Sequence, residues 1–161
     1  MINTAPWFYV PTVTVLGSII VAVANYLALR KRDKLERTNK FIDSICLEIN
    51  SAASLGTEYW LGPKDDIDEK DIKFKEFEMV GTQSRITNLI EILREQDKKI
   101  DLSEVDKDFK GFVENFTGGQ FKARPYTENQ NSVVLIQDKA AEINGHLRKS
   151  YEIRAKKFWF W

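Results

Sequence analysis

The chain has 161 residues, with 24 basic and 24 acidic side chains and no net charge at pH 7. This balance gives no electrostatic reason to expect a nucleic-acid-binding protein, because such proteins carry basic surfaces. The single cysteine, Cys46, excludes an internal disulfide and is typical of a reducing compartment. About 130 residues follow the N-terminal apolar stretch, which is enough for one domain with a modest core.

The N-terminal stretch carries no charged side chain from Met1 to Leu29. Its most apolar part, Trp7 to Leu29, would extend about 35 Å as a helix, against a bilayer hydrocarbon thickness of about 30 Å. A basic segment follows, which the positive-inside rule places in the cytoplasm. We therefore predict an uncleaved single-pass transmembrane anchor over residues 1–29, with the N-terminus outside and the C-terminus cytoplasmic. The alternative is a buried helix of a soluble protein.

Four small or polar residues of this stretch, Thr14, Ser18, Ala22 and Asn25, follow one another at steps of four, four and three. This spacing places them along one face of a helix. Small residues let helices approach closely, and an amide can hydrogen-bond across the contact. The face predicts a homo-oligomer. An equally weighted alternative is that the hydroxyls bond to their own backbone and that Asn25 lies at headgroup depth.

Residues 30–157 show the apolar periodicity of helices and no comparable strand pattern. A first helix runs from Arg30, continuous with the anchor, to a stop at Gly62 and Pro63. Further helices are predicted over residues 74–99, 105–116 and 133–151. The predicted fold class is all-α: an N-terminal transmembrane helix that continues into a cytoplasmic antiparallel bundle of about four helices.

The C-terminus, residues 158–161, is a cluster of aromatic side chains that follows two lysines. Alternating helix directions would return this end of the chain to the membrane, and aromatic rings with lysines suit a membrane interface. We therefore predict that Trp159 and Trp161 contact the lipid bilayer. The alternative is that this tail packs on the bundle or on another subunit.

The sequence shows no pattern of a catalytic, cofactor or metal site, so we predict a protein that is not an enzyme and binds no cofactor. His146, the one histidine, lies beside apolar Leu147 and is interpreted as solvated or partly packed. Cys46 is interpreted as a small core residue. The acidic run from Asp65 to Asp71 lacks the order of a calcium-binding loop and is interpreted as a solvated loop.

The connection before the last helix is longer than a simple turn requires. Gly118 and Gly119 permit a sharp reversal, Phe121 is apolar, and Lys122 and Arg124 are cationic. Two interpretations stay open for these five residues. Phe121 pins the loop over the end of the bundle, or the loop binds a partner, either a cytosolic protein or a ribonucleoprotein.

Two short segments carry a resemblance: Tyr59-Trp60 at the end of the first cytoplasmic helix, and Thr117-Gly118-Gly119-Gln120-Phe121 before the last helix. With the predicted anchor, this layout resembles uncharacterised bacterial single-pass membrane proteins, some associated with anti-phage defence as retron-type membrane effectors. The resemblance implies an inner-membrane effector of an abortive-infection system that oligomerises and perturbs the membrane. The alternative function is a non-toxic membrane-anchored helical adaptor that recruits a cytosolic partner.

Overall fold

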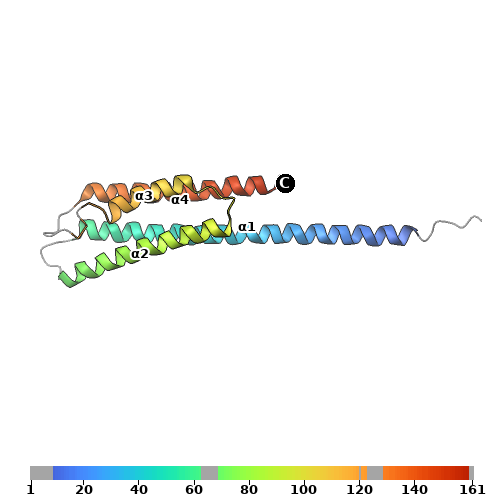
Figure 1. Ribbon diagram of the computed structural model, residues 1–161, viewed down its shortest axis with the longest axis horizontal. Coiled ribbons are helices and arrows are strands. Elements are labelled where there is room, and N and C mark those ends of the chain that lie inside the picture. Colours follow the sequence, from blue (N-terminus) through green and yellow to red (C-terminus); the bar gives the residue numbers. More distant parts are fainter. Residues whose placement is uncertain (1–8, 63–68, 120, 123–128, 160–161) are drawn as a thin grey trace, which may run out of the picture. The chain divides into compact units, whose positions relative to one another are not determined.

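The structure, a computed structural model, describes residues 9–62, 69–119, 121–122 and 129–159, with side chains from residue 15 to residue 157 of these ranges. It contains four helices, α1 (Tyr9–Leu61), α2 (Glu69–Gln96), α3 (Ser103–Phe116) and α4 (Gln130–Trp159) (Figure 1). The described ranges contain no strand, so the all-α prediction is confirmed. The chain divides into two compact units, Met1–Arg37 and Thr38–Trp161.

The predicted transmembrane anchor over residues 1–29 is wrong: in the part of the chain that the structure describes, no helix is both long and apolar enough to cross a membrane. The part of α1 without a charged side chain ends at Leu29. Arg30, Lys31 and Arg32 follow it directly. The sequence estimate also counted residues 7–14, whose side chains lie outside the described ones. The inner-membrane location and the orientation derived from the anchor fall with it. The side chains of the tail at residues 158–161 lie outside the described ones, so their predicted contact with the bilayer stays a prediction.

The second unit is a helical bundle, as predicted, in which α2 runs antiparallel to the C-terminal half of α1. The Tyr59 hydroxyl near the end of α1 donates a hydrogen bond to Glu76 Oε1 near the start of α2, at 3.1 Å. Further along both helices, Arg85 Nε donates to Glu48 Oε1 at 2.7 Å. The two pairs advance in opposite directions along the two sequences, which defines the antiparallel arrangement.

Helix α4 also runs antiparallel to α1, and α3 lies against α4 (Figure 1). Gln137 Nε2 of α4 donates to Thr57 Oγ1 at 2.9 Å, and Arg148 of α4 pairs with Asp43 of α1 at 3.4 Å. As the residue numbers rise along α4, the numbers of their partners on α1 fall. The two helices are therefore antiparallel. Side chains from all four helices contribute to one core.

The core is built from one apolar stripe on each helix, with members three, four or seven residues apart, as a helix repeat requires. The largest fully buried side chains are Trp60, Phe112, Phe116, Ile42, Ile45, Ile49, Met79, Ile86, Leu93, Ile136, Ile143 and Leu147. Cys46 is buried among them, and this burial raises the pKa of its thiol. Its role as a small core residue agrees with this position.

Alanine substitutions at two helical glycines of the bundle should change the stability of the protein in opposite directions. A Cβ atom on Gly81 would have no neighbour within 4 Å, so Gly81→Ala gains helix propensity and is expected to stabilise the protein by about 0.5–1 kcal/mol. A Cβ atom on Gly56 would lie 2.8 Å from Cδ2 of the fully buried Phe116. Gly56→Ala is expected to cost about 1–2 kcal/mol net, because overpacking outweighs propensity.

Urea unfolding of the two full-length variants, followed by circular dichroism at 222 nm, measures both free energies. Equal shifts in the same direction for Gly56→Ala and Gly81→Ala would contradict the described packing of Phe116 on α1.

Candidate functional site

A groove of about 370 Å³ lies between the start of α3 and the second half of α4, and we term it the α3–α4 groove. Pockets of a few hundred cubic ångströms are typical of small-ligand sites. The groove lies entirely within the second unit, Thr38–Trp161.

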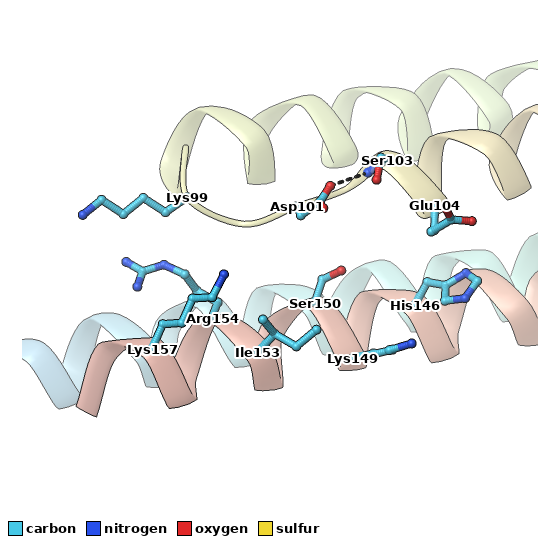
Figure 2. A pocket seen from close by; sticks show the side chains of 10 residues that line it. All are labelled: Lys99, Asp101, Ser103, Glu104, His146, Lys149, Ser150, Ile153, Arg154 and Lys157. Atoms are coloured by element: carbon cyan, nitrogen blue, oxygen red, sulfur yellow. Dashed lines mark hydrogen bonds between the residues drawn. The ribbon is translucent and has the colours of Figure 1, made fainter. Parts of the chain in front are cut away.

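Both walls of the groove are rich in polar and cationic side chains, as Figure 2 shows. The wall formed by the α2–α3 connection and the first turn of α3 carries Lys99, Asp101, Ser103 and Glu104. The wall formed by α4 carries His146, Lys149, Ser150, Ile153, Arg154 and Lys157. Residues 58 positions apart in the sequence thus share one surface.

The first wall is shaped by a hydrogen bond at the start of α3. The Ser103 backbone N–H donates to Asp101 Oδ1 at 3.0 Å, and Leu102, which has no polar side chain, occupies the N-cap position. The bonds from Ser103, with a smaller contribution from the charge of Lys157, hold the pKa of Asp101 below its ordinary value. Asp101 is therefore ionised at neutral pH, and its carboxylate stabilises the turn that begins α3.

One end of the groove is closed by a buried ion pair. Arg154 Nε of α4 donates to the two carboxylate oxygens of Asp97, just beyond the end of α2, at 3.2 and 3.1 Å. Both side chains are less than a tenth exposed. Such a pair contributes most when each partner's polar atoms are satisfied, since a buried unpaired charge is costly. It ties the end of α2 to α4.

The other end of the groove is held by a second buried carboxylate, Asp108 of α3. Its side chain is 6% exposed and accepts hydrogen bonds from His146 Nδ1 at 2.7 Å and Lys139 Nζ at 3.2 Å. Burial by itself would raise the pKa of Asp108, but the bonds from His146 and Lys139 hold it below its ordinary value. Because a carboxylate only accepts, His146 carries its proton on Nδ1.

His146 of α4 tethers this helix to α3 through its hydrogen bond with Asp108. Asp108 is the only hydrogen-bond partner of its ring among the residues that the structure describes. Within those same residues, no three imidazole, thiol or carboxylate groups gather as metal ligands. Residues 65–68 of the acidic run lie outside the described ranges.

The electrostatic character of the groove comes from its lysines. Across the described ranges, no ion-pair partner is found for Lys99 or Lys149, whereas the acidic Glu104 lies 3.8 Å from Lys107, outside the groove. Lys157 is close enough to Asp101 to lower its pKa. The lining therefore has more ammonium groups than carboxylates available to neutralise them.

The predicted loop residues form a corner at the opposite end of the bundle. Gly119 adopts a φ of 60°, and a Cβ atom on Gly118 would lie 2.0 Å from the Glu114 carbonyl oxygen, so both positions require glycine. The Phe121 ring packs on the core, 5.4 Å from the Tyr59 ring. This contact pins the described part of the loop, whereas Arg124 lies outside the described residues.

The Lys122 side chain is the exposed part of this corner. Its backbone N–H donates to the Tyr59 hydroxyl oxygen at 3.3 Å, and its own φ is 65°. Its ammonium lies 5.8 Å from the centre of the Phe77 ring, within the range of a cation–π contact. Phe74 and Phe77 of α2 are 69% and 72% exposed. The structure thus brings Phe121 and Lys122 together with Tyr59 and Phe77, which the sequence analysis did not connect.

The residues predicted for oligomerisation lie in the first unit. Ser18, Ala22 and Asn25 are exposed on α1. The side chains of Thr14, Trp159 and Trp161 are outside the described ones. The prediction of a shared face for the first three residues agrees with their position on one continuous helix.

The sequence analysis missed the buried charges that frame the groove, although a signal was present. Asp108 stands three residues after buried Val105 and four before buried Phe112, on the apolar stripe of α3. Arg154 stands seven residues after Leu147 on the stripe of α4. A charged residue at a stripe position predicts a buried charge with a partner on another helix. Which partner it finds depends on the packing of the helices.

Asp108 gives a prediction for stability and its dependence on pH. Asp108→Asn removes charge-assisted hydrogen bonds at a buried site and is expected to cost about 2 kcal/mol at pH 7. A carboxyl group whose folded pKa is lowered stabilises the protein above the unfolded value, here 3.8, and loses this contribution as the pH falls through the folded pKa. The difference between wild type and variant should therefore be smaller at pH 3 than at pH 5 or 7, because pH 3 lies below the unfolded pKa of 3.8.

Urea unfolding at pH 7, 5 and 3 measures this difference. The matched control is Asp106→Asn, which breaks the ion pair with Arg94 at a carboxylate that is 53% exposed and should cost less than about 1 kcal/mol. If the two variants lose equal stability at pH 7, the burial assigned to Asp108 is incorrect.

Comparisons of the chain with protein-family profiles, with curated proteins and with solved structures find no match. The resemblance to retron-type membrane effectors thus stays a prediction from the sequence.

Proposed function

We propose that the protein is a self-assembling helical scaffold, in which the apolar N-terminal part of α1 joins copies of the chain and the bundle is the domain that each copy displays. The observation that carries this proposal is the exposure of large apolar side chains on that part of α1. Nine of them, from Val15 to Leu29, are at least half exposed. A helix that is apolar over most of its surface is normally buried against other elements.

Among the described residues of the first unit, no further element covers this surface. In the described part of Met1–Arg37, α1 is the only element of secondary structure. A soluble monomer rarely exposes so large a contiguous apolar area. The covering element must therefore come from outside this unit, and a second copy of the same segment supplies a surface of matching chemistry.

The segment has two different sides, which complement one another. At about 100° per residue, Ser18, Ala22 and Asn25 fall within about 60° on one side. On the opposite side four larger apolar side chains also fall within about 60°. These are Leu16, Ile20, Val23 and Leu27, which are 60%, 68%, 51% and 50% exposed.

The side that carries small residues in one copy can pack against the side that carries large apolar residues in the next. This arrangement fills space better than a contact between two identical sides. Small residues leave room into which large side chains of a neighbour fit, as in interdigitated helix packing. An Asn within such a contact fixes its register, since its amide both donates and accepts hydrogen bonds. Contacts of this heterologous kind join more than two copies.

The energetics also favour more than one neighbour per helix. Burying a half-exposed Val, Leu or Ile contributes on the order of 1 kcal/mol, so nine such side chains offer on the order of 10 kcal/mol for each copy. Association costs about 4–15 kcal/mol in lost translation and rotation. A contact that covers only one side of the helix would yield about half of this burial free energy, which favours contacts on both sides.

The proposal keeps the recruiting role of the adaptor predicted from the sequence, without its membrane anchor. Assembly multiplies the number of bundles, and repeated weak binding of a partner then gains from the high local concentration. The membrane-perturbing effector predicted from the resemblance depended on a spanning helix. Since no helix among the described residues is long and apolar enough to cross a membrane, we do not propose the effector mechanism.

Paired cysteine substitutions test the heterologous arrangement in the full chain. Ser18 and Ile20 lie at nearly the same height on opposite sides of α1, about 160° apart, so they cannot form a disulfide within one chain. In a parallel assembly, residue 18 of one copy meets residue 20 of the next. The double variant Ser18→Cys/Ile20→Cys is expected to give a ladder beyond the dimer after oxidation in cells, read on a non-reducing gel.

The controls are Ser18→Cys alone, the same-side double variant Ser18→Cys/Asn25→Cys, and the wild type, whose one cysteine is buried. All three should remain monomeric on the gel. A dimer from Ser18→Cys alone would show like sides in contact and overturn the heterologous arrangement. Absence of crosslinked species from every variant would overturn self-assembly.

A further inference from the structure

The α3–α4 groove is lined by three lysine ammonium groups but by only two carboxylates, those of Asp101 and Glu104. Lys99 and Lys149 have no ion-pair partner among the described residues, and Lys157 lies on the same lining. Of the two acidic residues of the lining, Asp101 accepts the Ser103 backbone N–H and interacts with the charge of Lys157, and Glu104 lies 3.8 Å from Lys107, outside the groove. Lys99 and Lys149 are therefore the ammonium groups without a paired carboxylate among the described residues. Ammonium groups that line one hollow repel one another, and a bound anion relieves this repulsion.

The remaining polar groups of the groove suit an oxyanion. The Ser150 side chain lies on α4 between His146 and Arg154, on the wall that faces the start of α3 (Figure 2). A hydroxyl donor beside lysine point charges is a combination that proteins use to bind phosphate groups. The volume of about 370 Å³ suits a small molecule, since ligand pockets begin at about 300 Å³.

The walls of the groove are held in place without a ligand. The buried Asp97–Arg154 pair fixes one end, and the bond between Asp108 and His146 fixes the other. A ligand therefore does not have to order these elements when it binds, which reduces the entropic cost of binding. The lysines, which are exposed, are the parts free to close on it.

We propose that the α3–α4 groove binds a small phosphorylated ligand, with Lys99, Lys149 and Lys157 as its charge partners and Ser150 as a hydroxyl donor. This inference is independent of the self-assembly proposed above, because the groove lies within one copy of the bundle. The charge of the groove does not distinguish free phosphate groups from those of a nucleotide, so these two sources form separate arms of the test.

Calorimetric titration of the full chain with inorganic pyrophosphate, at an ionic strength held constant with KCl, measures binding. Lys99→Gln/Lys157→Gln removes two charges from the groove and is expected to lose at least about tenfold in affinity. The matched control is Lys98→Gln/Lys156→Gln, which removes two exposed neighbouring charges outside the lining and should bind as the wild type does. Both variants alter exposed lysines, and circular dichroism verifies their fold.

A nucleoside diphosphate and citrate complete the experiment. Tighter binding of the nucleoside diphosphate than of pyrophosphate identifies a nucleotide as the source, and equal binding identifies the phosphate groups alone; either result supports the site. Three results overturn it: no saturable binding of pyrophosphate, an equal loss in both double variants, or binding of citrate as tight as that of pyrophosphate.

Discussion

The arrangement of the four helices depends on three buried carboxylates, each of which must find a donor on a neighbouring helix. Glu76, Asp97 and Asp108 are 5%, 3% and 4% exposed. An uncompensated buried charge costs several kcal/mol. Sliding one helix by a turn, about 5.4 Å, would keep its apolar stripe against the core but would separate the carboxylate from its donor. We infer that the apolar stripes bring the helices together and that the polar pairs select one register.

The same constraint creates the α3–α4 groove. Arg154 is drawn to Asp97 beyond the end of α2, and His146 is drawn to Asp108 on α3. The stretch of α4 between these two contacts faces the α2–α3 connection, and Ile153 is the one large apolar residue that it contributes to the lining of the groove. Lysines and serines also line it. The surface with the most distinctive chemistry in the bundle is thus a direct consequence of the contacts that set the register.

The corner around Tyr59 shows how a loop can be anchored by few contacts. The Tyr59 hydroxyl donates to Glu76 and accepts from the Lys122 backbone, so one side chain of α1 joins α2 to the connection before α4. The Phe121 ring adds an aromatic contact to the same tyrosine. Gly118 and Gly119 permit the backbone to enter this corner, since a Cβ atom at the first would meet backbone and the second has positive φ.

The sequence by itself determined the number, kind and approximate limits of the helices, because helical periodicity, Gly62 and the glycines after Phe116 are local signals. It also indicated that Cys46 lies in the core, which its burial confirms. The transmembrane assignment is wrong, since no helix among the described residues is both long and apolar enough to cross a membrane.

Only the tertiary structure decided which side chains meet. A stripe position shows that Asp108 is buried, but its partners His146 and Lys139 are more than thirty residues away in the sequence. Periodicity carries information about one helix at a time, whereas a groove, an ion pair or an anchored loop depends on the distance between helices. That distance is set by side-chain packing across the whole core, which is why the α3–α4 groove could not be read from the sequence.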